Sequence, residues 1–155
     1  MPRKSTKENK NIYQICRENK GLTREAAAEL LETMDENRIK RIEGGAAPRP
    51  DEILRMADKY CAPLLCNHYC VNNCELGESQ VHEITQKNLQ QITLEMIHAI
   101  NELSAEKDRL IAIAVDGKVT EDELPDFKRL RKQLDAMASI IGSLQLWVDE
   151  NMQST

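Results

Sequence analysis

The spacing of apolar residues over the first 60 positions predicts a series of short helices. They are expected over residues 11–20, 24–31, 36–43 and 50–60. Thr23 and Asp35 are favoured N-cap residues for the second and third helices, and Pro50 suits the first position of the fourth. Gly21 and the pair Gly44–Gly45 are expected to end the first and third helices.

Each short helix is expected to bury one stripe of side chains. In the first helix, the buried face is predicted to contain Ile12, Ile15 and Cys16. In the third helix, Ile39 and Ile42 are expected to point inward. Together the four short helices predict a small helical bundle.

The second half of the chain follows a longer pattern. Two helices are predicted over residues 80–115 and 121–151, separated at Asp116–Gly117, with Thr120 and Glu123 as a capping box for the second. In the second helix, apolar residues recur every three or four positions, at Phe127, Leu130, Leu134, Met137, Ile141, Leu144 and Val148. The first shows nearly the same spacing, at Leu89, Ile92, Met96, Ala99, Leu103, Leu110 and Ile113. This pattern predicts an antiparallel helical hairpin with a coiled-coil-like seam.

Together these elements predict an all-α protein, with an N-terminal bundle of four to five short helices followed by the hairpin. Only 3% of the 155 residues are aromatic, and the commonest residues favour helices. Four segments are expected: a flexible basic tail over 1–10, a helical domain over 11–60, a cysteine-rich joint over 61–78 and the hairpin over 79–155.

Charge and motif content narrow the class of function. The net charge of −5 divides into +2 over residues 1–60 and −7 over residues 61–155, so positive charge is kept at the N-terminal end. The six glycines form no phosphate-binding loop, and the chain contains no nucleophile elbow. No signal peptide or membrane-spanning apolar run occurs. The sequence therefore predicts a cytoplasmic, non-enzymatic protein with no membrane partner and with reduced thiols.

Two stretches within the first 60 residues carry a resemblance. Residues 19–27 read Asn-Lys-Gly-Leu-Thr-Arg-Glu-Ala-Ala, and residues 37–45 read Asn-Arg-Ile-Lys-Arg-Ile-Glu-Gly-Gly. They resemble the second helix and the recognition helix of the phage-repressor and Cro-like family, also called the XRE family. The resemblance covers roughly the first third of the chain, and it implies a helix-turn-helix domain over residues 11–60.

The resemblance also implies roles for individual residues. In the family, a residue at the position of Arg24 contacts a phosphate, the start of the recognition helix faces the major groove, and the following loop meets the DNA backbone. The implied DNA-binding residues are Arg24, Glu36, Asn37, Arg38, Arg41 and Arg49. The implied function is a sequence-specific transcriptional regulator, a repressor, that binds double-stranded DNA with residues 36–43 in the major groove.

A second interpretation stays open because the sequence departs from the family at two places. The link over residues 32–34 is one residue longer than usual and lacks glycine, and Glu36 brings a negative charge to the groove-facing side. The alternative is a non-enzymatic interaction protein, an adaptor or antirepressor with a degenerate helix-turn-helix.

Four of the five cysteines, Cys61, Cys66, Cys70 and Cys74, lie within 14 residues. Their clustering predicts a zinc or iron–sulfur site. Cys66 and Cys74 would lie ~12 Å apart on a straight helix, so a single site requires a break, which Asn72–Asn73 is suited to provide. The alternative is a set of ordinary reduced thiols, some of them packed as small apolar groups.

The hairpin over residues 79–155 also predicts an association. Two helices alone have little room to bury both apolar seams, so a homodimer is expected, in which two hairpins form a four-helix bundle. Such a dimer would place two recognition helices about one DNA turn apart, ~34 Å. The alternatives are another protein partner for the same segment, or packing of the hairpin on its own N-terminal domain.

Overall fold

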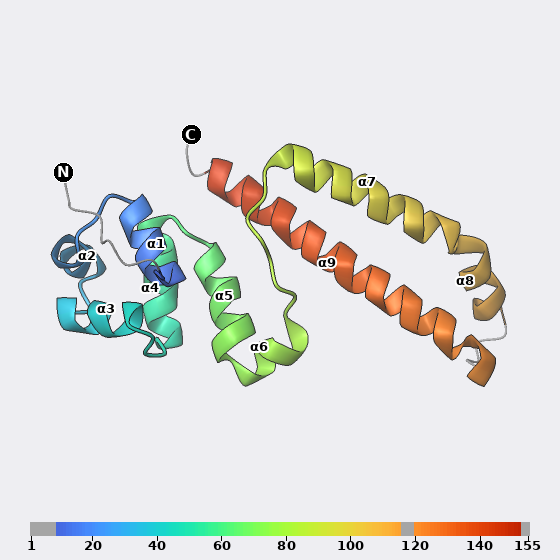
Figure 1. Ribbon diagram of the computed structural model, residues 1–155, viewed down its shortest axis with the longest axis horizontal. Helices are drawn as coiled ribbons and strands as arrows, with labels where there is room; N and C mark the ends of the chain where they lie inside the picture. Colours follow the sequence, from blue (N-terminus) through green and yellow to red (C-terminus); the bar gives the residue numbers. More distant parts are fainter. Residues whose placement is uncertain (1–8, 116–119, 153–155) are drawn as a thin grey trace. The chain divides into compact units, whose positions relative to one another are not determined.

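The computed structural model describes residues 9–115 and 120–152. Within these residues the protein is all-α, as predicted, and contains no strand (Figure 1). The predicted break at Asp116–Gly117 and most of the predicted basic tail lie outside the described residues. The chain divides into two compact units between Val81 and His82, and residues 149–152 group with the first unit.

The first unit consists of short helices whose ends follow local cap chemistry. They are α1 (Ile12–Asn19), α2 (Arg24–Leu31), α3 (Glu36–Glu43), α4 (Pro50–Tyr60), α5 (Leu64–Asn73) and α6 (Glu75–Gln80). The predicted caps are confirmed, because Thr23 Oγ1 accepts a hydrogen bond from the Ala26 N–H at 3.1 Å and Asp35 Oδ1 accepts one from the Arg38 N–H at 2.7 Å. Gly21 takes the left-handed conformation after α1, with φ +76°.

One hydrophobic core lies beneath α1–α5. It contains Tyr13, Ala27, Leu31, Met34, Ile39, Ile42, Ile53, Met56, Ala57, Tyr60 and Leu65. Ile39 and Ile42 are inward, as predicted. The predicted face of α1 is partly wrong, because Ile15 is 42% exposed, whereas Tyr13 and Arg17 are buried. The helix turns this way because the large Tyr13 ring fills the core and Arg17 meets the carboxylate of Glu43.

Most of the cysteine-rich segment is helical. Leu65 of α5 is fully buried in the core of the first unit, so that core extends beyond residue 60. The helix break comes at Cys74, whose extended backbone (φ −120°, ψ 115°) separates α5 from α6. Gly77 lies against α5, because a Cβ at this position would be 2.0 Å from the carbonyl oxygen of Cys70.

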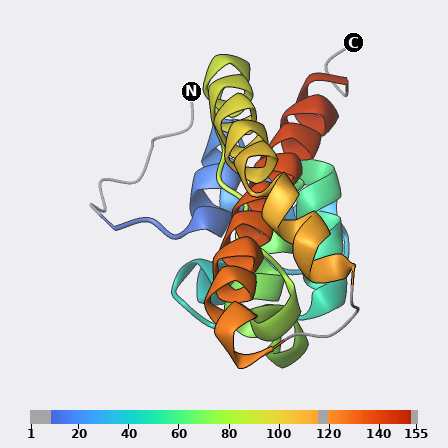
Figure 2. The same ribbon diagram turned by 90° about the vertical axis from the view of Figure 1, so that its right-hand side faces the viewer.

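The second unit contains α7 (Leu89–Ala105), α8 (Lys107–Ala114), a 3₁₀ turn (Glu121–Glu123) and α9 (Leu124–Met152), which continues past the end of this unit. Helices α7 and α9 run in opposite directions (Figure 1 and Figure 2). The prediction of one helix over residues 80–115 is wrong. Residues 81–88 are not helical and α8 is separate.

A local cap and contacts distant in sequence explain why the helix does not extend back from α7 to residue 80. The Asn88 side chain caps α7 by accepting a hydrogen bond from the Gln91 N–H at 2.8 Å. The preceding segment runs beside α9 instead, where the Glu83 carbonyl accepts a hydrogen bond from Ser139 Oγ at 2.6 Å. Gly142 of α9 permits close approach, since a Cβ there would lie 2.8 Å from the Ile84 side chain. Contacts distant in sequence therefore replace the helical ones.

The predicted seam of the hairpin is only partly buried. Ile92 and Ala99 of α7 are buried, but in α9 the buried residues are Ser143 and Leu146. Three predicted seam residues of α9 are exposed instead, namely Leu134, Ile141 and Val148. On α7, Leu94, Ile97 and Ile100 are also exposed. No helix within the described residues has the length and apolar character needed to cross a membrane.

Candidate nucleic-acid interface

The link between α2 and α3 is a tight turn without glycine. Glu32 ends α2 in the left-handed conformation (φ 58°, ψ −26°), and its N–H donates to the Ala28 carbonyl at 3.0 Å. Met34 is buried and anchors the turn to the core. Asp35 then caps α3. A residue other than glycine thus adopts the backbone geometry that separates the two helices, at the cost of local strain.

Helix α3 has one buried and one exposed side. Ile39 and Ile42 are fully buried and fix its rotation about its own axis. Four exposed side chains lie on the opposite side at i, i+1, i+4 and i+5, and we call them the open face of α3: Glu36, Asn37, Lys40 and Arg41. This face therefore presents a carboxylate, an amide and two cations to solvent.

Arg38 does not belong to the open face of α3. It is half-buried, and its guanidinium forms a two-pronged contact with Glu52 of α4, with Nε–Oε1 at 2.8 Å and Nη2–Oε2 at 2.7 Å. Nη2 also donates to the Ala47 carbonyl at 3.2 Å. The Glu52 side chain is only 4% exposed, and its hydrogen bond with Arg38 lowers the pKa of its carboxyl group. Arg38 is thus directed toward the protein.

Arg24 is also engaged by a carboxylate. Its Nε lies 2.7 Å from Glu43 Oε2, and the Glu43 side chain is 1% exposed. The same carboxylate receives Arg17 Nε at 2.5 Å and Arg17 Nη2 at 3.1 Å. Burial opposes the charge of Arg17, but the hydrogen bond and charge of Glu43 outweigh it and raise the pKa of the guanidinium. Glu43 thus ties α1 and α2 to the end of α3.

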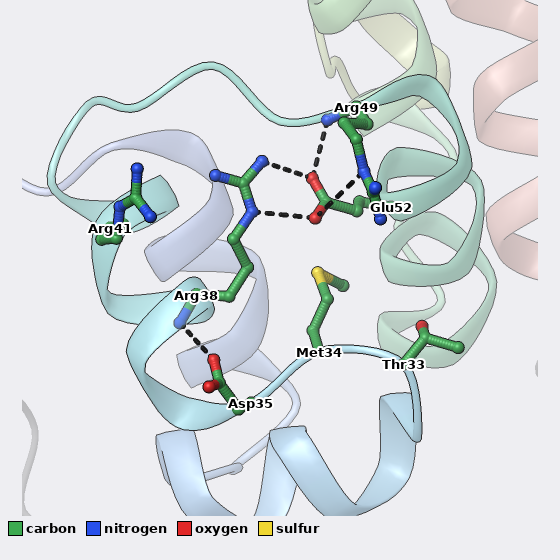
Figure 3. Close-up of a pocket in the computed structure, with 7 residues that line it drawn as sticks. All are labelled: Thr33, Met34, Asp35, Arg38, Arg41, Arg49 and Glu52. Atoms are coloured by element: carbon green, nitrogen blue, oxygen red, sulfur yellow. Dashed lines mark hydrogen bonds and ion pairs between the residues drawn. The ribbon is translucent and has the colours of Figure 1, made fainter.

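An open pocket of about 620 Å³ lies beside α3 (Figure 3). It is lined by Thr33, Met34, Asp35, Arg38, Arg41, Arg49 and Glu52. In Figure 3, Arg38 reaches across from α3 to the Glu52 carboxylate, and Arg49 lies on the other side of that carboxylate. Arg41 and Arg49 are both exposed, so the rim of the pocket carries two cations.

The first unit matches a known domain family. Residues 14–67, about a third of the chain, match the family model described as a helix-turn-helix domain. This match supports a helix-turn-helix DNA-binding domain. No curated protein and no solved structure matches the chain.

The six residues that the sequence implies in DNA binding have three different environments in the structure. Glu36, Asn37 and Arg41 share the open face of α3, and Arg49 is exposed beside it. Arg24 and Arg38 are held by buried carboxylates. Lys40 also lies on the open face and was missed by sequence reasoning, although its place one turn after Glu36 and beside Arg41 was a usable signal.

The four cysteines of the predicted metal site lie at different structural positions. Cys66 and Cys70 are one turn apart on α5, Cys74 follows that helix, and Cys61 ends α4, where its Sγ accepts a hydrogen bond from Lys20 Nζ at 3.0 Å. Within residues 9–115 and 120–152, no three His, Cys, Asp or Glu side chains form a group suited to a metal ion. A zinc or iron–sulfur site stays a prediction. Metal analysis and a visible spectrum after anaerobic purification test it.

Proposed function

We propose that the protein is a sequence-specific DNA-binding transcriptional regulator in which α3 enters the major groove. The observation that carries this proposal is the open face of α3. Its side chains point into solvent, and the fully buried Ile39 and Ile42 fix the rotation of α3 about its own axis. A rigid helix with one exposed polar face suits insertion into a groove that admits a single α-helix.

The chemistry of this face fits base edges. Asn37 has the paired donor and acceptor that match adenine, Arg41 has the fork that matches O6 and N7 of guanine, and Glu36 accepts a hydrogen bond from the amino group of cytosine. Arg49, exposed beside the pocket, is placed in this proposal against a phosphate, as is Arg24 at the start of α2.

We assign a repressor role to this regulator. Repression requires only that the protein occupies a site overlapping a promoter, which a DNA-binding domain and a second copy can achieve. Activation needs a further contact with the transcription machinery. A promoter fusion measured with and without the protein separates the two, since repression predicts lower expression when the protein is present.

The second unit supports dimerisation in this proposal. Leu134, Ile141 and Val148 are exposed at seven-residue intervals along α9, the repeat expected for a seam with another helix. Pairing of two such units would cover these side chains and join two helix-turn-helix domains for a palindromic site. Sedimentation of the full chain tests this, because a monomer at micromolar concentration would contradict it. Ile141→Asp is expected to shift the dimer toward monomer, and Ala136→Asp, which is exposed on α9 but lies away from this stripe, serves as the control.

Retention of genomic DNA fragments by the purified protein tests the proposed function. We expect a small set of fragments to be enriched at low salt, and their affinity to fall steeply as salt rises, because phosphate contacts release counterions. Failure to retain any fragment at low salt would contradict DNA binding.

An interaction protein, an adaptor or antirepressor, is the second candidate function. One observation favours it, since Glu43 and Glu52 hold two of the arginines implied in DNA binding. This pairing reduces the positive charge that the domain presents to a polyanion. Under this alternative, the open face of α3 contacts a protein, and its substitutions change protein association with no effect on DNA retention.

A further inference from the structure

The contact between Arg38 and Glu52 has the geometry of a brace for the loop between α3 and α4. Glu52 Oε2 accepts a hydrogen bond from the backbone N–H of Arg49 at 2.7 Å, while the same carboxylate holds the Arg38 guanidinium through both oxygens. Arg38 in turn donates to the Ala47 carbonyl. The loop is therefore held at its backbone on both sides of the buried Pro48.

The brace also reaches the side chain of Arg49. Arg49 Nε lies 3.6 Å from Glu52 Oε1, although the Arg49 side chain itself is 65% exposed. The carboxylate thus lies between two guanidinium groups, one directed inward and one left in solvent at the rim of the pocket (Figure 3). Such an arrangement restricts where the exposed cation can be while leaving its outer side accessible.

We propose that Arg38 is a positioning residue, which acts through Glu52 to hold the α3–α4 loop so that Arg49 meets a DNA phosphate, and that it does not read a base. This inference rests on the proposed function. The sequence implies that Arg38 faces the groove, and this inference gives it a different role. The guanidinium edge that would bind guanine is already occupied by the carboxylate of Glu52, which has a matching shape.

Removal of the Glu52 carboxylate distinguishes the two possible roles of Arg38 by the direction in which DNA affinity changes. If Arg38 read DNA, Glu52→Gln would release it and remove a negative charge, so affinity would stay the same or rise. If Arg38 positions the loop, Glu52→Gln loosens Arg49 and lowers affinity, even though a negative charge has been removed from a DNA-binding surface. Glutamine keeps an oxygen that can accept the Arg49 N–H, so the cap of α4 is retained.

The experiment measures duplex affinity against salt for wild type, Glu52→Gln, Arg38→Gln and the double variant. The duplexes are the sequence that wild type selects from a random library and its single-base-pair variants. Loss of one phosphate contact should weaken binding about eightfold at 0.1 M salt and reduce the salt slope by ~1 for every sequence. We expect that result for both single variants, with no further loss in the double. Asp58→Asn, which removes an exposed negative charge elsewhere on α4, should not weaken binding.

A readout without DNA accompanies the binding assay. Circular dichroism must show that each variant is folded, and amide hydrogen exchange of Ala46 and Ala47 should be faster in Glu52→Gln and Arg38→Gln than in wild type. A changed preference at one base pair in Arg38→Gln, with undiminished binding by Glu52→Gln, would overturn the inference and leave the proposed function standing. Absence of DNA binding by wild type would overturn both.

Discussion

Replacement of Glu43 by glutamine tests how the first unit is held together. The Glu43 carboxylate is almost fully buried and is the shared partner of Arg17 and Arg24. Glutamine has nearly the same shape but no charge, so the variant leaves the buried guanidinium of Arg17 with only the carboxylate of Glu18, 3.9 Å away. Breaking a buried ion pair in this way costs about 3–5 kcal/mol.

That cost is comparable with the whole stability of so small a unit. At roughly 0.05–0.15 kcal/mol per residue, a unit of about 75 described residues is stable by ~4–11 kcal/mol. With a urea m-value near 1 kcal/mol/M for this size, the unfolding midpoint should fall by about 3–5 M. Glu43→Gln is therefore expected to be largely unfolded over residues 12–80, or close to unfolding.

Peptide-resolved hydrogen exchange and a urea titration followed by circular dichroism measure this effect. The matched control is Glu29→Gln, the same substitution at an exposed position of α2, which should change stability by less than about 0.5 kcal/mol. If Glu43→Gln loses less than ~1 kcal/mol of unfolding free energy and the Arg17 amide stays protected from exchange, the claim that Glu43 is needed to offset the buried charge of Arg17 is refuted.

Three further substitutions or conditions test other parts of the fold. Because Arg38 lowers the pKa of Glu52 below its unfolded value near 4.3, the unfolded state binds more protons on acidification. The contribution of this group to stability is therefore present above that pH and lost as pH falls through the folded pKa, and acid titrations of Glu52→Gln should show a flatter decline. Glu32→Gly, at a left-handed position, should be neutral or stabilising by up to ~1 kcal/mol in thermal melts, whereas Glu29→Gly within α2 should cost about 1 kcal/mol. Gly77→Ala places a methyl group against the Cys70 carbonyl, so it should cost about 1–3 kcal/mol in urea titrations, and a loss below ~0.5 kcal/mol would contradict the close packing of α5 and α6.

The short helices could be predicted from sequence because their ends depend on neighbouring residues. Thr23 and Asp35 each satisfy an N–H three positions later, so the signal lies within one turn of chain. The same holds for Gly21, whose left-handed backbone follows from the residue type. Local chemistry of this kind is visible without knowledge of the tertiary structure.

The directions of Arg24 and Arg38 could not be predicted, because their partners are distant in sequence. Arg24 meets Glu43, 19 residues away, and Arg38 meets Glu52, 14 residues away. The segment before Asn88 shows the same limit, since its residues have a helical pattern but are held beside α9. Where tertiary contacts compete with local preference, periodicity alone gives the wrong element.

Base preference in variants of the open face of α3 tests the central claim most directly. The measurement selects bound duplexes from a random library with wild type, Asn37→Ala and Arg41→Ala, with Glu29→Gln as the control. The account predicts one preferred sequence for wild type and for the control. Each alanine variant should lose about 5- to 150-fold in affinity and relax the preference at one base pair. Enrichment of no sequence by wild type, or an identical preference in all four proteins, would contradict the claim that α3 reads DNA.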